Sequence, residues 1–211
     1  MRHPPFFGYD QPLIAEYAKR YGQCRESDFG NENWQLLQCE LMSDFVRKAR
    51  QAIDAVDPKI ALEVSFDEKN YYAQGLDVAH WLKSGWVDMI APGIGDVGEE
   101  KYFPLQPFTA MIKTSPRKCL LFPRVEATIY GGDTTAKEEQ GLEKIHRRNV
   151  SLNMFRELFL KFRAEGADGI RPFNTGYPTL AEALADENGL KCFARNIAPL
   201  LDVRQELKTE R

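Results

Sequence analysis

Four short apolar segments that alternate with helical segments constrain the fold of this chain most. In residues 59–66, Ile60, Leu62, Val64 and Phe66 alternate with small or polar residues, which is the period-two pattern of a strand. Strands are also predicted over residues 86–93, 118–126 and 168–173, with helices between them over 75–85, 107–114 and 150–165. This alternation predicts an α/β protein with a parallel sheet.

Two further helices are predicted before the first strand and one after the last. A short helix over residues 13–21 ends at Gly22, and a long helix over residues 34–56 ends before Pro58. In the long helix the apolar pattern includes Phe45, and the charged residues are expected on the solvated face: Arg47, Lys48, Arg50 and Asp54. The last helix is expected over residues 190–201.

Polar side chains follow the predicted strands at their carboxyl ends. Asp67 follows the first strand, Glu126 ends the third and Arg171 lies in the fourth. No Gly-rich phosphate turn follows the first strand, as a doubly wound sheet would often have. Polar groups at the carboxyl ends of parallel strands are typical of the active face of a βα barrel. The pattern therefore favours part of a (β/α)8 TIM barrel.

Glu126 is the first candidate catalytic residue. Strand alternation places Leu120, Phe122, Arg124 and Glu126 on one side of the third strand. Arg124 could keep Glu126 ionised, and an ionised carboxylate serves a glycosidase as nucleophile or base. A structural ion pair between the two at the strand end is an equal alternative.

Asp67 is the second candidate, because glycoside hydrolysis needs two carboxyl groups across the scissile bond. Glu63 lies deeper in the same strand, where a buried and partnered role is expected. Asp88 precedes its strand and is expected at the opposite end of the sheet. Sugar-binding roles are open to Arg171, Asn174 and Tyr177, although a packed turn explains Tyr177 equally well.

Composition excludes several classes of function. The formal net charge of -3 leaves no basic field for nucleic acid. No apolar run is long enough to span a bilayer, and the start lacks the apolar region of a secretory signal, so a cytoplasmic protein is expected from the sequence as given. The cysteines and histidines lack metal-binding spacing, so no metal or cofactor is expected. The four cysteines are interpreted as buried free thiols.

Several phrases resemble a known family. These are Met1 to Phe7, residues 75–78, residues 81–88 and residues 166–170. They resemble family-10-like glycosyl hydrolases of bacterial origin, which are βα barrels that act on or bind polysaccharide. In that family an R-x-P element follows a strand near the middle of the barrel, and Arg2-His3-Pro4 stands in that position here. Arg2 and Tyr130 therefore join Arg124 as candidate substrate-binding residues.

The number of predicted strands limits how much of a barrel the 211 residues can form. A barrel needs eight strands and the pattern supplies about four, so residues 1–211 are interpreted as one domain, the carboxyl-terminal half of a barrel. The resemblance places the usual acid/base carboxylate on a missing upstream strand and Glu126 at the nucleophile position. Secretion or a periplasmic location is expected instead if a signal peptide lies in missing upstream sequence.

Two functional hypotheses remain open. The first is a glycoside-hydrolase-like domain, an O-glycosyl hydrolase only if its barrel is completed, that retains Glu126 and sugar-contacting residues. The second is a non-catalytic half-barrel that binds carbohydrate or assembles with a second copy or with a complementing amino-terminal half. An enzyme for phosphorylated substrates is disfavoured, because no Gly-rich phosphate loop precedes the last helix.

Overall fold

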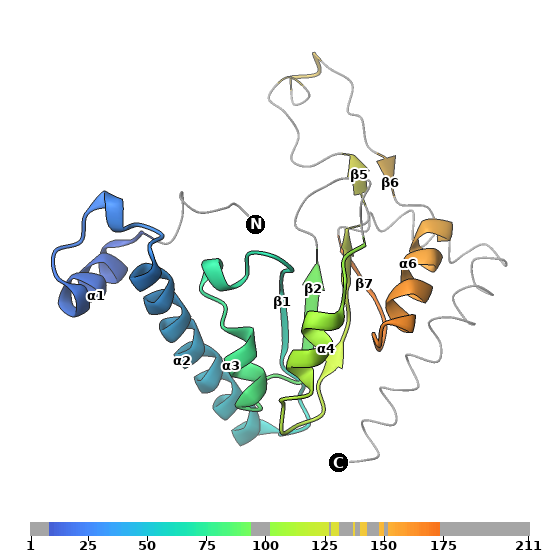
Figure 1. Ribbon diagram of the computed structural model, residues 1–211, viewed down its shortest axis with the longest axis horizontal. Helices are drawn as coiled ribbons and strands as arrows, with labels where there is room; N and C mark the ends of the chain where they lie inside the picture. The colour runs from blue at the N-terminus through green and yellow to red at the C-terminus, as the bar shows by residue number, and fades with distance from the viewer. Residues whose placement is uncertain are drawn as a thin grey trace.

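The fold is known from a computed structural model, which describes residues 9–93, 102–126, 128–130, 137, 140–142, 148–149 and 152–173. Helices α1 (Gln11–Tyr21) and α2 (Glu32–Val56) come first, joined through the short 3-10 helix η1 (Glu26–Asp28). Strands and helices then alternate along the chain, and Figure 1 shows the strands grouped beside α3, α4 and α6. The predicted α/β class is confirmed.

The main sheet is parallel. It contains β1 (Glu63–Asp67), β2 (Met89–Gly93), β3 (Leu120–Leu121), β4 (Arg124–Glu126) and β7 (Arg171–Phe173), in the order β1-β2-β4-β7 with β3 also paired to β2. Asp67 pairs with Gly93, Gly93 with Arg124, and Arg124 with Arg171. The strands therefore follow one another across the sheet in the order of the sequence.

All four strands begin later than predicted, and the structure gives a local reason for the differences in the first and the third. The first begins at Glu63 rather than at residue 59, because residues 58–60 form a turn closed by the Ile60 amide donating to the Asp57 carbonyl at 3.1 Å. The third is interrupted at Pro123, which lacks the amide that a ladder needs. The Pro123 carbonyl still accepts from the Arg171 amide at 2.9 Å, which carries the pairing across the gap.

The helices between the strands cover one face of the sheet. These are α3 (Val78–Lys83), α4 (Gln106–Ile112) and α6 (Leu152–Ala164), with η2 (Tyr72–Gln74) before α3. Right-handed crossovers between strands in consecutive order place their helices on the same side. The core accordingly joins sheet residues Phe66, Ile90, Leu121 and Val125 to helix residues such as Trp81 and Phe162.

The amino-terminal helices form a second apolar cluster. Asp10 caps α1 by accepting from the Leu13 amide at 3.0 Å, and Asn31 caps α2 by accepting from the Trp34 amide at 2.8 Å. Trp34 is fully buried and packs against aromatic and aliphatic neighbours of this cluster: Tyr9, Leu13, Ile14, Tyr17, Phe29 and Leu37. The 25-residue α2 thus connects this cluster to the sheet.

The two faces of α2 differ from the prediction. Arg50, expected in solvent, is 3% exposed, whereas Phe45, expected in the core, is 66% exposed. The reason is that a different face of α2 packs on α3 and the sheet. This face carries Ser43, Val46 and Arg50. The Ser43 hydroxyl accepts from the Trp81 indole at 2.8 Å, so polar groups take part in this buried contact.

A small antiparallel pair follows the main sheet at β4. Strand β5 (Thr128–Tyr130) pairs with β6 (Arg148–Asn149), where a long polar loop is predicted between residues 130 and 148. The helix predicted over residues 190–201 lies outside the described residues. Within the part of the chain that the structure describes, no helix is long and apolar enough to cross a membrane.

Candidate functional site

The face of the sheet opposite the helices carries the candidate site. Because Phe66 and Val125 point into the helix-side core, alternation turns their strand neighbours to the other side. We call this side the inner face. It carries Glu63 at the amino-terminal end of β1 and, toward the carboxyl ends of the strands, Ser65, Asp67, Gly93, Arg124, Glu126, Arg171 and Phe173. The predicted alternation of Arg124 and Glu126 is confirmed.

An ion pair joins the two outermost strands across the inner face. The Arg171 guanidinium on β7 contacts the Glu63 carboxylate on β1, although β2 and β4 lie between these strands. Neighbouring strands are spaced about 4.8 Å apart, so their backbones are about 14 Å apart in a flat sheet. The contact therefore spans the width of the sheet. Glu63 thus has the partner predicted for it, but its side chain is 30% exposed rather than buried.

Arg124 lies at the centre of the inner face. Its side chain runs over Gly93 of β2, where an added Cβ would lie 2.7 Å from the Arg124 Cβ and 2.9 Å from its Nε. Arg124 Nη1 donates to the Ser65 hydroxyl on β1 at 3.3 Å. Its guanidinium carbon is 4.8 Å from the centre of the Phe173 ring on β7. One arginine therefore contacts three other strands, and only glycine leaves room for it at residue 93.

The predicted pairing of Arg124 with Glu126 is wrong. Among the ion pairs of the described residues, none joins these two side chains, and the Arg124 guanidinium turns to Ser65 and Phe173 instead. The Arg124 side chain runs over Gly93 toward β1, away from Glu126 on its own strand. Arg124 thus interacts with neighbouring strands rather than with its own.

The two candidate carboxylates are both buried. Asp67 and Glu126 are each 8% exposed, and they lie on strands β1 and β4 with Gly93 of β2 between them. Asp67 Oδ1 accepts from the Lys69 amide at 3.0 Å, which fixes its orientation. The structure therefore places both predicted acids on the same face and at the same end of the sheet.

A third carboxyl, Glu68, was missed by the sequence analysis. Burial raises the pKa of Glu68, and the neighbouring Asp67 carboxyl raises it further, while the Glu68 main-chain amide lowers it. The Glu68 amide donates to the Gly93 carbonyl at 3.1 Å, which continues the ladder beyond β1. An acidic pair at a strand end was the available signal, because adjacent carboxyls resist ionising together.

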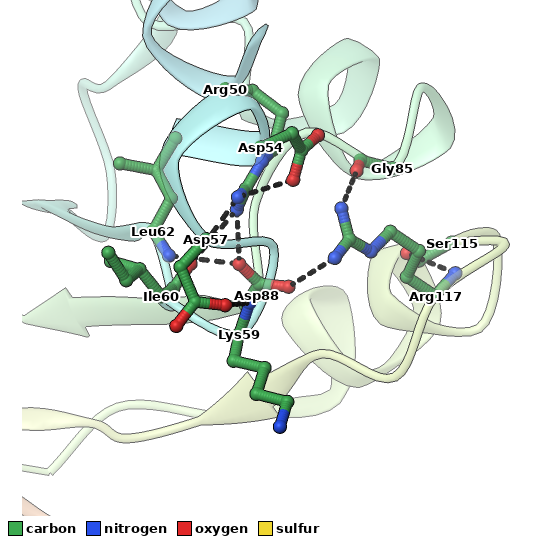
Figure 2. Close-up of polar contacts among 10 residues, drawn as sticks. All are labelled: Arg50, Asp54, Asp57, Lys59, Ile60, Leu62, Gly85, Asp88, Ser115 and Arg117. Atoms are coloured by element: carbon green, nitrogen blue, oxygen red, sulfur yellow. Dashed lines mark hydrogen bonds and ion pairs between the residues drawn. The ribbon is translucent and has the colours of Figure 1, made fainter. Parts of the chain in front are cut away.

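A separate charged cluster lies at the opposite end of the sheet, as predicted for Asp88 (Figure 2). Asp88 Oδ2 accepts from Arg50 at 2.8 Å and from the Leu62 amide at 2.9 Å, and Asp88 Oδ1 lies 3.3 Å from Arg117 Nη2. Arg50 also contacts Asp54 at 2.6 Å. Asp88 is 5% exposed. In parallel βα folds, groups at the amino-terminal end of the strands serve stability, so this cluster is structural.

The remaining candidate residues are described in part or not at all. Arg2, Asn174 and Tyr177 lie outside the described residues, and only the backbone of Tyr130, in β5, is described. Arg171, a predicted sugar-binding residue, forms an ion pair with Glu63.

The cysteines of the described residues are free thiols. Cys39 and Cys119 are buried free thiols as predicted, Cys24 is a half-buried one, and Cys192 lies outside the described residues. Within the described ranges, no group of three His, Cys, Asp or Glu residues could hold a metal ion.

No protein-family model matches the chain, and no curated protein matches it. The inner face is therefore the basis for a functional proposal.

Proposed function

We propose that this chain is a four-strand segment of a βα barrel that binds a carbohydrate on its inner face. The consecutive strand order supports this, because each strand of a βα barrel lies beside the next one in sequence. The contact between Glu63 and Arg171 adds support, since side chains inside a barrel fill its interior in layers. These features favour a barrel segment over a doubly wound sheet, in which the strand order reverses.

One observation carries the carbohydrate proposal. Two buried carboxylates, Asp67 and Glu126, share the carboxyl end of the inner face with the 42% exposed ring of Phe173. Aromatic rings stack on the apolar faces of sugars, and carboxylates accept hydrogen bonds from sugar hydroxyls. The carboxyl ends of barrel strands are where such sites lie.

The chemistry proposed for this site is glycoside hydrolysis with Glu126 as nucleophile or base. Hydrolysis also requires a carboxylic acid that protonates the leaving oxygen from the other side of the bond. The resemblance assigns that acid to an upstream strand. We therefore expect the chain alone to bind sugar with little or no cleavage.

Binding of oligosaccharides tests the carbohydrate proposal. We expect isothermal titration calorimetry with a panel of β-linked oligosaccharides to find at least one ligand, and Phe173→Ala to weaken its binding about tenfold. Leu160→Ala on α6 is a matched control, because Leu160 is 48% exposed on a helix. Absence of binding across the panel would contradict the proposal.

The hydrolytic part requires a separate assay. We expect the chain joined to any βα units encoded upstream of Met1 to release reducing sugar, and Glu126→Gln to abolish that release while binding persists. Inactivity of the joined protein on a substrate that it binds would reject hydrolysis and leave binding intact.

Self-assembly is the alternative, and an exposed apolar stripe on α2 favours it. The stripe consists of Leu41, Phe45 and Val56, which are 42%, 66% and 81% exposed. A second copy related by a twofold axis along the strands would place β1 beside β7 twice and give eight parallel strands. We expect light scattering after size-exclusion chromatography to report a dimer that Phe45→Glu dissociates. A folded monomer at micromolar concentration would reject this alternative.

A further inference from the structure

Arg124 differs from the other arginines that contact the sheet. Arg171 is paired with Glu63, and Arg50 and Arg117 are both paired with Asp88. Arg124 has no carboxylate within ion-pair distance in the part of the chain that the structure describes, where its side-chain contacts are the Ser65 hydroxyl and the Phe173 ring. Its guanidinium thus forms no ion pair with these residues on the inner face.

The position of the guanidinium leaves donors available. An arginine has five N–H donors in a planar fork, and the bond to Ser65 uses one of them. The Phe173 ring lies 4.8 Å from the guanidinium carbon, and Gly93 lies under the side chain. The guanidinium is therefore positioned from three strands before any ligand binds. This fork matches the two oxygens of a carboxylate or a sulfate.

The surrounding charges limit how many negative groups a ligand can bring. Glu63 is offset by Arg171, and Glu68 is offset by Lys69 at 3.6 Å. Asp67 lies on the same face, and no ion pair involves its carboxyl among the described residues. A densely charged polyanion would be repelled by Asp67, whereas one acidic group placed at Arg124 would be attracted.

We propose that the inner face selects a saccharide that carries one oxyanion group on the bound pyranose ring, recognised by Arg124. A uronic acid carboxylate and a sulfate ester share this chemistry. The inference rests on the proposed carbohydrate site and adds the substrate class. It also gives Gly93 a role, because a side chain there would displace Arg124.

Calorimetry at constant ionic strength tests this inference with three probes. These are a β-linked oligosaccharide with one glucuronate residue, its neutral glucose counterpart of equal length, and the same neutral oligosaccharide with one sulfate ester. We expect at least one acidic probe to bind ten times more tightly than the neutral one. Arg124→Gln should remove that preference, and Arg124→Lys should keep part of it, because lysine retains the charge without the fork.

Two further variants separate recognition of the oxyanion by the Arg124 side chain from an effect of the protein's net charge. Lys113→Gln removes one positive charge from an exposed residue after α4 and should leave the preference unchanged. Gly93→Ala keeps the Arg124 charge but displaces its side chain, so it should reduce the preference as Arg124→Gln does. Circular dichroism and urea unfolding confirm that each variant is folded before its affinity is compared.

The possible outcomes distinguish this inference from the proposed function. Equal binding of neutral and acidic probes overturns the oxyanion inference but leaves a carbohydrate site. Absence of binding by all three probes overturns both. Binding of inorganic sulfate as tight as that of the sulfated oligosaccharide overturns the saccharide part, because Arg124 then holds only a free ion. A preference for either acidic probe that depends on Arg124 supports the inference and identifies which oxyanion is used.

Discussion

Arg171 on β7 forms an ion pair with Glu63 on β1, across the two strands that separate them. This contact links the first and last strands of the sheet on its inner face. It also leaves Arg124 as the arginine of that face with no carboxylate partner among the described residues.

The Glu63–Arg171 pair should contribute modestly to stability. The two side chains are 30% and 44% exposed, so solvent screens their attraction. We expect Arg171→Met and Glu63→Gln to show a coupling of about 0.3 to 1 kcal/mol in a double-mutant cycle of urea unfolding. Zero coupling would mean that this contact does not hold the outer strands together.

Asp88→Asn should be the most damaging of the single changes considered. The substitution leaves Arg50, which is 3% exposed, without the buried carboxylate that neutralises it from the residue before β2. Loss of one partner from a buried ion pair costs about 3 to 5 kcal/mol, which urea unfolding would measure. Asp54→Asn is the matched control, because Asp54 contacts the same arginine but is 42% exposed, and its loss should cost below about 1 kcal/mol. Similar losses for both variants would contradict the structural role of Asp88.

Gly93→Ala should destabilise the protein through a steric overlap. The new Cβ would lie 2.7 Å from both the Cβ and the carbonyl oxygen of Arg124, and backbone atoms cannot move aside cheaply. Overpacking of this kind costs about 1 to 3 kcal/mol, measured by urea unfolding. Ser65→Ala removes the hydroxyl contact of Arg124 without adding volume and should cost less. A neutral effect of Gly93→Ala would show that Arg124 does not cross β2 at this point.

Glu68→Gln should stabilise the protein at pH 7. The folded protein raises the pKa of Glu68, chiefly through burial, so folding favours the protonated carboxyl. Its stabilising contribution is present below the unfolded pKa and is lost as the pH rises through the folded pKa. Glutamine resembles the protonated form, so the gain over the natural protein should shrink as the pH falls to 4. Urea unfolding at several pH values measures this, and a gain that is independent of pH would contradict it.

Cys119 should resist thiol reagents in the folded protein. Burial raises the pKa of Cys119 to about 12 and that of Cys39 to about 11, so the reactive thiolate is scarce at pH 8. We expect peptide mapping after iodoacetamide treatment to find Cys24 labelled before Cys39 and Cys119, because it is only half-buried. The raised pKa values of Cys39 and Cys119 also contribute to the stability of the folded protein. This contribution is fully present below the unfolded pKa of 9.0 and is lost as the pH rises from there through about 11 and 12. Rapid labelling of Cys119 at pH 8 would contradict its burial.

The parallel α/β class could be predicted because local periodicity encodes it. Alternation in residues 59–66 and helical spacing in residues 34–56 both correspond to observed elements. The position of Asp88 at the opposite end of the sheet from Asp67 also followed from strand direction alone. Strand bounds were less accurate at Pro123, where the missing proline amide interrupts a strand that the alternation pattern predicted as continuous.

The sequence by itself determined the element types, the strand direction and the fact that Arg124 and Glu126 share one side of their strand, because these follow from the chemistry of nearby residues. Only the tertiary structure decided that Arg50 is buried against Asp88, that Arg171 pairs with Glu63 and that Arg124 turns to Ser65. These contacts join residues 38, 108 and 59 positions apart. Pairings over such separations depend on how the strands and helices pack, which local pattern does not specify.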